Sequence, residues 1–385
     1  MANTERTEDL RILGAVTAAY TIGVLGGNLQ PLVIGALIDS LGLDAADAGF
    51  LGSIELAAIA VASFVLAPRM AAIPRRALIV AGGVLAASGY ICSALVQSFI
   101  ALAVCRVVAG TGGGIVLAIG NAAVSGCQRP QRMFAQMIVV GTLLITGILA
   151  VLPAAVAAWG YHGAYAGMAL VVGALLPLLL AIPDRAMVDQ SHRAADSAHA
   201  ALGIATAAAA VLLFFGQSAM WAFSERIAIA AQLTRAQISV ALSGSTLAGL
   251  CGAVGANWIG LRYRRTSPLL AGILATGGTI LALVYARGPV AYTTILVANG
   301  IAYLFMVPYV MGTAAALDPH GRWAAATVGA ANVGAACGPG IAGKVIEAAG
   351  YTPMGWLIFA GALLSAAAVA PVSRALDHTD VSGME

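Results

Sequence analysis

Residues 99–126 read FIALAVCRVVAGTGGGIVLAIGNAAVSG, and Arg106 is the only charged residue among them. A helix needs roughly 20 apolar residues to cross the hydrocarbon core of a bilayer, so this stretch predicts one membrane-spanning helix. Charged, polar or Gly/Pro clusters divide the rest of the chain into eleven further stretches of the same kind. The twelve predicted spans cover residues 11–39, 47–68, 76–97, 99–126, 132–158, 163–183, 200–226, 236–261, 267–286, 289–317, 322–347 and 353–373.

The composition excludes a soluble protein. Of the 385 residues, 61% are hydrophobic and 9% are charged, and the mean hydropathy is +0.93. Soluble domains carry about 25% charged residues. The 19 basic and 16 acidic residues of this chain cannot cover a soluble surface of its size. We therefore expect an all-α integral membrane protein in contact with the lipid bilayer. A net charge of +3 gives no basic surface for nucleic acid, so we expect no nucleic-acid partner.

The basic residues indicate the orientation of the spans, because positive charge is retained on the cytoplasmic side of a membrane. With the N-terminus inside, 14 of the 19 basic residues fall in cytoplasmic segments and four fall in outer segments. The cytoplasmic ones are Arg6, Arg11, Arg69, Arg75, Arg76, Arg129, Arg132, Arg185, Arg193, Arg262, Arg264, Arg265, Arg322 and Arg374, and the outer ones are Arg226, Arg235, Arg287 and Lys344. We therefore expect a multi-pass protein of the inner or plasma membrane with both termini in the cytoplasm.

The longest polar stretch, Asp184 to His199, lies near the midpoint of the chain. It predicts a first domain over residues 1–183, a cytoplasmic linker over residues 184–199 and a second domain over residues 200–385. The two halves also match at a shift of about 190 residues, as expected of an internal repeat. The shift places Leu43–Asp47 on Leu233–Gln237, Ser53 on Ser243, Arg75 on Arg265, Gly110 on Gly300 and Arg132 on Arg322. Two six-span halves in parallel repeat are a transporter architecture, with the solute site between the halves.

The fourth span carries a motif of a known transporter family. Arg106-Val-Val-Ala-Gly110-Thr-Gly112 resembles the Arg-x-x-x-Gly-x-Gly motif of the major facilitator superfamily, and the resemblance extends over almost the whole chain. It implies twelve transmembrane helices in two pseudo-symmetric six-helix bundles. It also implies secondary transport by alternating access.

A second signature of that superfamily, in the loop after the second span, is only partly present. Ala67–Arg76 keeps the terminal Arg75 and Arg76 of the signature and has Ala71 in the place of its aspartate. The resemblance implies that the two arginines take part in gating the inner face.

Two charged residues lie deep in predicted spans. Glu55 follows Asp47 by eight residues and Arg106 follows Ser98 by eight, so both lie roughly 12 Å below the outer boundary. A charge at mid-bilayer costs roughly 2.5–3.5 kcal/mol on insertion scales, so a charged residue at this depth is expected to have a structural or functional role. The resemblance implies that both helices contribute to the central cavity, which makes a Glu55–Arg106 pair geometrically possible.

Two interpretations of this pair remain open. An anionic solute that binds Arg106 would free Glu55 to take up a proton, which couples solute movement to proton movement. Alternatively, the ion pair only fixes the first half of the protein. The second half has Ser245 and Leu296 at the equivalent positions. This difference favours the coupling hypothesis, because a purely structural pair is expected in both halves.

Further polar residues interrupt the apolar spans. Gln217, Trp221 and Glu225 are spaced at i, i+4 and i+8 and share one face of the seventh span. Gln217 and Trp221 are candidates for substrate contact. Glu225 lies near the outer end, where either a pair with Arg226 or Arg235 at an outer gate or a contact with the substrate is expected. The other candidates for substrate contact are Tyr20, Asn28 and Gln30 in the first span, Gln136 in the fifth, Asn299 and Tyr303 in the tenth and Asn332 in the eleventh. Each of them also suits an interhelical hydrogen bond, and together they suit a small-solute site.

These features predict a monomeric secondary transporter that moves a small organic solute, with an anionic group, by proton-coupled symport. Export of a drug or metabolite in exchange for protons is the alternative within the same class. An intramembrane enzyme or a receptor is the alternative from another class, and the sequence offers neither paired catalytic His/Asp clusters nor a soluble signalling domain. The five histidines and five cysteines show no metal-ligand spacing, so we expect no metal and no cofactor.

Overall fold

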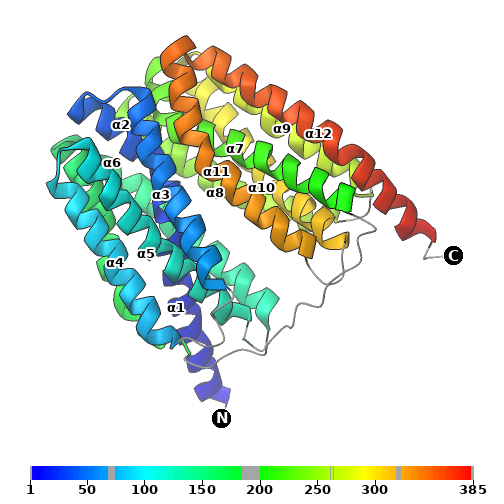
Figure 1. Cartoon of the computed structure of the whole chain (residues 1–385), viewed down its shortest axis with the longest axis horizontal. Helices are drawn as coiled ribbons and strands as arrows, with labels where there is room; N and C mark the ends of the chain where they lie inside the picture. The colour runs from blue at the N-terminus through cyan, green and yellow to red at the C-terminus, as the bar shows by residue number, and fades with distance from the viewer. Residues whose placement is uncertain are drawn as a thin grey trace. The chain divides into compact units, whose positions relative to one another are not determined.

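The computed structural model describes residues 2–67, 74–125, 127, 129–183, 200–260, 262, 264–317 and 322–382, and it describes side chains only between residues 10 and 377 of these. Helices and connecting loops make up this part of the chain, which contains no strand (Figure 1). The helices are α1 (Ala2–Asn28), α2 (Gln30–Leu41), α3 (Ala45–Leu66), α4 (Arg75–Leu95), α5 (Phe99–Ser125), α6 (Pro130–Leu175), α7 (Ala200–Ala230), α8 (Arg235–Ile259), α9 (Thr266–Val284), α10 (Gly288–Ala316), α11 (Arg322–Ala349) and α12 (Tyr351–Ser382). The predicted all-helical membrane fold is confirmed at this level.

The contacts divide the chain into two compact units. The first contains residues 1–43 and 50–190, and the second contains residues 44–49 and 191–385. Within the first unit, α4 and α1 each lie against α5 and α6. Within the second unit, α7 lies against α11 and α12, α8 lies against α10, and α9 lies against α10 and α12 (Figure 1). The predicted linker, residues 184–199, falls outside the described residues, and the predicted domain boundaries remain a prediction.

The first predicted span, residues 11–39, forms two helices. α1 ends at Asn28, and Leu29 takes a non-helical conformation with φ −93° and ψ 2° before α2 begins. Pro31 lies in the first turn of α2, where a residue without a backbone N–H is tolerated because no intrahelical acceptor is needed. The conformation of Leu29 therefore divides the predicted span into two helices.

The fifth and sixth predicted spans lie in one continuous helical segment, Pro130–Ala181, which includes the short 3₁₀ helix Leu176–Ala181. Its 52 residues would extend about 78 Å if straight, more than twice the hydrocarbon thickness. Gly160 breaks the segment with φ +57° and ψ −141°. A Cβ on Gly167 would contact the side chain of Leu152, although residues this far apart in a straight helix are about 22 Å apart. The chain therefore reverses at Gly160 and forms two antiparallel spans.

Ten helices of the described chain are long and apolar enough to cross a membrane by length and composition. The reversing segment Pro130–Ala181 counts as one of the ten, and α11 is not among them. Because Pro130–Ala181 contains two predicted spans and α11 coincides with the eleventh, these helices match the twelve stretches identified from the sequence.

The internal repeat has counterparts in the backbone and in the packing. Gly42 and Gln232 both have positive φ angles, and so do Gly160 and Gly350. The two residues of each pair are 190 positions apart in the sequence. The approach of neighbouring helices is repeated as well. A Cβ on Gly110 of α5 would meet the carbonyl oxygen of Glu55 in α3, and a Cβ on Gly300 of α10 would meet that of Ser245 in α8. The equivalent helix pairs of the two units therefore pack through equivalent small residues.

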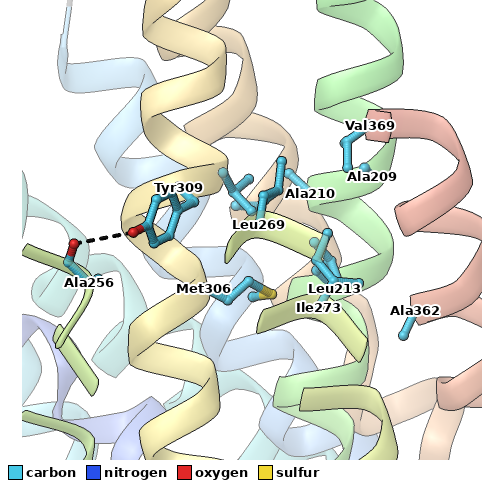
Figure 2. Packing of buried hydrophobic residues seen from close by; sticks show 12 residues of the cluster. Ala209, Ala210, Leu213, Ala256, Leu269, Ile273, Met306, Tyr309, Ala362 and Val369 are labelled. Carbon is cyan, nitrogen blue, oxygen red and sulfur yellow. Dashed lines mark hydrogen bonds between the residues drawn. The ribbon is translucent and has the colours of Figure 1, made fainter. Parts of the chain in front are cut away.

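The second unit has a buried core formed by side chains of all six helices from α7 to α12. Its members include Leu213, Ile273, Met306 and Tyr309, which Figure 2 shows packed together. The Tyr309 hydroxyl donates hydrogen bonds to the carbonyl oxygens of Ala256, at 3.3 Å, and Gly260, at 3.0 Å. These bonds fix the last turn of α8 against α10.

A carboxylate from α12 caps α9. Asp377 Oδ1 accepts a hydrogen bond from the backbone N–H of Arg265 at 2.7 Å, and its Oδ2 accepts from the backbone N–H of Thr266 at 3.2 Å and from the Thr266 hydroxyl at 2.7 Å. The first N–H groups of a helix have no intrahelical partner, and a negative charge is favourable there. Asp377 therefore ties the end of α12 to the start of α9.

We expect Asp377→Ala to lower the free energy of unfolding by about 1–2 kcal/mol, because the cap and its charge are lost together. The measurement is the thermal unfolding temperature of the purified protein in detergent. Asp47→Ala is the matched control, because Asp47 is an exposed carboxylate in the first turn of α3. Equal shifts for the two variants would contradict a specific role of the Asp377 cap.

Candidate functional site

Glu55 of α3 and Arg106 of α5 form an ion pair inside the first unit. Arg106 Nη1 donates to Glu55 Oε2 at 3.1 Å, and the two side chains are 1% and 4% exposed, respectively. The pairing inferred from their matching depth is therefore present. A buried ion pair of this kind is stable only when further hydrogen bonds satisfy the remaining donors and acceptors.

The guanidinium of Arg106 has several additional contacts. Its Nη2 donates to the hydroxyl of Ser93 and, at 3.4 Å, to the carbonyl oxygen of Gly89, both in α4. The guanidinium carbon lies 4.2 Å from the ring centroid of Tyr165 and 5.1 Å from that of Tyr90. A cation over an aromatic face is stabilised by the ring quadrupole. Arg106 is therefore held by α4 and α6 as well as by Glu55.

The carboxylate of Glu55 has a second donor. The Tyr90 hydroxyl donates to Glu55 Oε1 at 2.8 Å, so each carboxylate oxygen accepts one hydrogen bond. Space for the carboxylate comes from Gly26 of α1, because a Cβ at that position would lie 2.6 Å from Glu55 Cδ. The cluster Glu55, Arg106, Tyr90, Ser93 and Tyr165, called the charge cluster below, thus has members from α3, α4, α5 and α6.

Three members of the charge cluster were not identified from the sequence. Tyr90 and Ser93 are spaced at i and i+3 in α4, which places them on one face of an otherwise apolar helix. This spacing is the feature of the sequence from which Tyr90 and Ser93 could have been predicted as site residues. Tyr165 has no comparable signal, because its position beside Arg106 depends on the reversal of the chain at Gly160.

Two polar atoms of the charge cluster have no hydrogen-bond partner among the described residues. They are Arg106 Nε and the Tyr165 hydroxyl, and both are buried. Buried polar groups are nearly always paired, and an unpaired one costs about 1–3 kcal/mol. The charge cluster can therefore accept another polar partner. Because an arginine does not lose its proton in proteins, Glu55 is the group of the ion pair that can take up a proton.

Four predicted site residues lie elsewhere in the first unit. Gln30 is buried and donates from Nε2 to the carbonyl oxygen of Gly52 at 3.2 Å. Asn28 donates to the carbonyl oxygen of Val24 at 2.9 Å, within its own helix. The two remaining residues are Tyr20 and Gln136. The ring of Tyr20 lies against Gly141 of α6, and Gln136 is half-buried in α6. The bond of Gln30, which joins α2 to α3, is an interhelical hydrogen bond of the kind stated above, whereas this bond of Asn28 lies within α1.

The second unit contains a polar network that links α7, α9 and α10. Gln217 Nε2 donates to Asn299 Oδ1 at 3.2 Å, and Asn299 Nδ2 donates to the Thr279 hydroxyl at 3.1 Å. Asn299 is 1% exposed. Two predicted site residues, Gln217 and Asn299, are therefore in direct contact. Thr279 was not identified from the sequence, because a threonine in a membrane helix commonly bonds to its own backbone.

The remaining predicted site residues of the second unit are dispersed. Trp221 and Tyr303 are half-buried, and the Tyr303 ring packs edge-on against Phe214 with a centroid distance of 5.9 Å. Asn332 of α11 is exposed. The structure therefore gives Asn332 no place in the network of Gln217 and Asn299.

The predicted gating residues lie near helix ends. Glu225 is buried and Arg226 is half-buried in the last two turns of α7. Arg75 is buried at the start of α4, and Arg76 Nε donates to the carbonyl oxygen of Ile182 at 3.4 Å. Ala71, the departure from the superfamily's loop signature, lies outside the described residues. The role of these four residues in gating remains a prediction.

Comparisons with known proteins agree on one fold. The family model described as Major Facilitator Superfamily matches residues 13–315. Comparison with curated protein sequences finds no match. The solved structure of the nucleoside transporter NupG has a TM-score of 0.76 at 15% identity and covers 96% of this chain and 99% of its own. A POT family transporter in complex with 5-aminolevulinic acid has a TM-score of 0.75 at 15% identity, covering 95% of this chain and 96% of its own. At such low identities the two structures show a shared fold.

We expect Gly26→Ala to destabilise the protein by about 1–3 kcal/mol, because the added methyl group would displace the Glu55 carboxylate from its position beside Arg106. The thermal unfolding temperature measures this effect. Gly27→Ala is the matched control on the neighbouring residue of the same helix. Its Cβ would meet only the flexible end of Leu56, at 3.2 Å, and alanine is favoured over glycine in a helix by roughly 0.5–1 kcal/mol. Similar losses in both variants would show that the carboxylate does not require the space at Gly26.

Proposed function

Because the chain belongs to the Major Facilitator Superfamily and is thus a secondary transporter, we propose that it carries a small organic anion by symport with protons. The observation that supports this proposal best is the buried Glu55–Arg106 pair. The proposed solute contact is Arg106, the proposed halves are residues 1–183 and 200–385, and a monomer is the working unit.

The second unit offers an argument against a purely structural pair. Ser245 and Leu296 are the repeat equivalents of Glu55 and Arg106, and the Ser245 hydroxyl donates to the Leu296 carbonyl oxygen at 2.8 Å. A neutral hydrogen bond therefore joins α8 to α10 where an ion pair joins α3 to α5. Because two charges in the membrane cost several kcal/mol that a neutral bond avoids, the charges of the first unit serve a purpose other than helix pairing.

The proposed coupling follows from charge balance. An anion that binds Arg106 takes the place of the Glu55 carboxylate, and two negative charges beside one guanidinium are unfavourable in a low dielectric. Uptake of a proton by Glu55 removes the excess charge. Arg106 keeps its bonds to Ser93 and Gly89 during this exchange, and its Nε offers a further donor for the solute. Solute and proton therefore bind together, which is the requirement for symport.

We expect Glu55→Gln to abolish solute-driven proton entry and to preserve solute exchange, because a glutamine can accept a hydrogen bond from Arg106 but cannot bind and release a proton. A thermal-shift screen with organic acids and hydrophobic cations at two pH values first identifies a solute. Proteoliposomes that contain a pH-sensitive dye then report proton entry, and radiolabelled counterflow reports exchange. Arg106→Lys, which keeps the charge and loses the fork of donors, should weaken both.

Ser245→Ala is the matched control, because it alters the equivalent position of the second unit, and we expect it to leave the ratio of proton to solute movement unchanged. Tyr90→Phe, which removes one donor to Glu55, serves if Glu55→Gln does not fold, and its proton coupling should be reduced. Normal proton-driven uptake in Glu55→Gln, Arg106→Lys and Tyr90→Phe would refute the coupling role. Proton movement opposite to solute movement would show that the protein is an antiporter. Thermal stabilisation of the protein by cations alone would refute the proposal that its solute is an anion.

We further propose that the protein lies in the inner or plasma membrane with both termini in the cytoplasm, because 14 basic residues fall on that side and four on the other. Alkaline phosphatase fused after Gly288, between the ninth and tenth predicted spans, should be active because it is exported. The same enzyme fused after Arg264, between the eighth and ninth spans, should be inactive. The reverse pattern would invert the orientation.

A further inference from the structure

Gln217 has one buried polar atom without a hydrogen-bond partner in the described part of the chain. Its Nε2 donates to Asn299 Oδ1 at 3.2 Å, whereas its Oε1 is buried and accepts no hydrogen bond from a described residue. These residues include the whole of α7, α9 and α10, the three helices of this network. Buried polar groups are nearly always paired, so the unpaired oxygen can accept a hydrogen bond from a ligand.

The network determines which end of the Gln217 amide is left unpaired. Asn299 Nδ2 lies 3.5 Å from the carbonyl oxygen of Thr276, which can only accept, and 3.1 Å from the Thr279 hydroxyl. The Thr279 hydroxyl donates within α9, to the carbonyl oxygens of Ala275 at 2.8 Å and Thr276 at 2.9 Å, so its oxygen accepts from Asn299. Asn299 therefore directs its NH₂ group to α9 and its oxygen to Gln217. Gln217 must donate to that oxygen, and its own carbonyl oxygen remains as an acceptor.

The arrangement cannot easily reverse. Asn299 is 1% exposed and Thr276 is 3% exposed, so water does not compensate for a rotated amide. A rotated Asn299 would place its oxygen against the carbonyl oxygen of Thr276, and both groups would lose a partner. The acceptor character of Gln217 is therefore fixed by α9, although the two residues that fix it do not touch Gln217 themselves.

Aromatic side chains lie beside the Gln217 amide. Phe214 precedes Gln217 by three residues and Trp221 follows it by four, so the three side chains share one face of α7. Tyr303, one turn after Asn299 in α10, packs edge-on against Phe214 with a centroid distance of 5.9 Å. Phe214, Gln217, Trp221 and Tyr303 are all half-buried. This face of the second unit therefore combines apolar ring surface with one hydrogen-bond acceptor.

We propose that Gln217 Oε1 accepts a hydrogen bond from a hydroxyl or amine of the transported solute, and that the adjacent aromatic side chains contact its carbon skeleton. The inference rests on the proposed transport of a small organic solute and names a group of that solute which the charge cluster does not recognise. A site built to pair with a donor rejects an analogue that lacks it, because the acceptor is then left unpaired. Water offers the same O–H donor and is the competing occupant, but the aromatic rings favour a solute with a planar carbon skeleton.

Isothermal titration calorimetry of the purified full chain in detergent tests the proposal with matched pairs of probes. One pair is 4-hydroxybenzoate and 4-fluorobenzoate, and the other is their uncharged methyl esters, so that the members of a pair differ only in the donor. We expect the hydroxyl member of each pair to bind about tenfold more tightly, as one hydrogen bond allows. Gln217→Met keeps the length of the side chain and removes its acceptor, so this preference should disappear while the affinity for the fluoro probes is retained. 4-Aminobenzoate shows whether an amine binds more tightly than a hydroxyl.

Thr279→Val provides a second variant if Gln217→Met does not fold. It removes one acceptor of Asn299 Nδ2 and loosens the hold on the amide orientation, so the preference for the hydroxyl probes should decrease. Thr246→Val is the matched control. The Thr246 hydroxyl donates to the carbonyl oxygen of Leu242 at 2.9 Å within α8, so it makes the same kind of bond to its own helix. It has no part in the network, and its loss should leave the preference unchanged.

Three results would overturn the proposal. They are the absence of binding by every probe, equal affinity of the unaltered protein for the hydroxyl and fluoro probes, as expected if water alone occupies the acceptor, and a preference that survives Gln217→Met, or Thr279→Val in its place. The methyl esters separate these results from the proposed anion. A hydroxyl preference among the esters without binding of the acids would refute the anion and retain the contact at Gln217, and binding of the acids without a hydroxyl preference would do the reverse.

Discussion

Polar groups inside a bilayer have no water to bond with, so each one left without a partner in the protein costs free energy. In this chain the requirement for partners is most severe at Arg106, whose guanidinium is 1% exposed. Its charge is balanced by Glu55, by two acceptors in α4 and by the faces of two tyrosines. These contacts come from three helices besides its own, so the position of Arg106 fixes the arrangement of much of the first unit.

The same requirement explains why small residues line the helix contacts. Lipid tails are as apolar as leucine, so close van der Waals contact and interhelical hydrogen bonds hold membrane helices together. Gly110 allows α5 to approach the backbone of α3 at Glu55, and Gly300 allows the equivalent approach of α10 to α8 at Ser245. With this shared packing, each unit satisfies its polar groups differently. The first unit uses an ion pair and the second uses a neutral hydrogen bond at the equivalent position. The repeat therefore preserves geometry while its chemistry diverges.

The depth of two charges was sufficient to predict their pairing. Glu55 follows Asp47 by eight residues and Arg106 follows Ser98 by eight, and the fixed rise of a helix converts these equal counts into similar depths. The contacts of Asn299 were less predictable. Its partners Gln217 and Thr279 belong to different helices, and which helix faces which is a property of packing rather than of any single span. Asn332 is exposed on α11, and its predicted contact with substrate remains a prediction.

The sequence by itself determined the class of protein, the helical spans, the repeat and the two charges that need an explanation. These follow from hydrophobicity and from the fixed rise of a helix, which are local properties of the chain. Only the tertiary structure decided that Tyr90, Ser93 and Tyr165 surround Arg106, that Asp377 caps α9 and that Gln217 contacts Asn299. The physical reason is that these contacts depend on the rotation of each helix about its axis and on the reversal at Gly160. The rotation is set by packing between helices far apart in the sequence, and the reversal by the positive φ of Gly160.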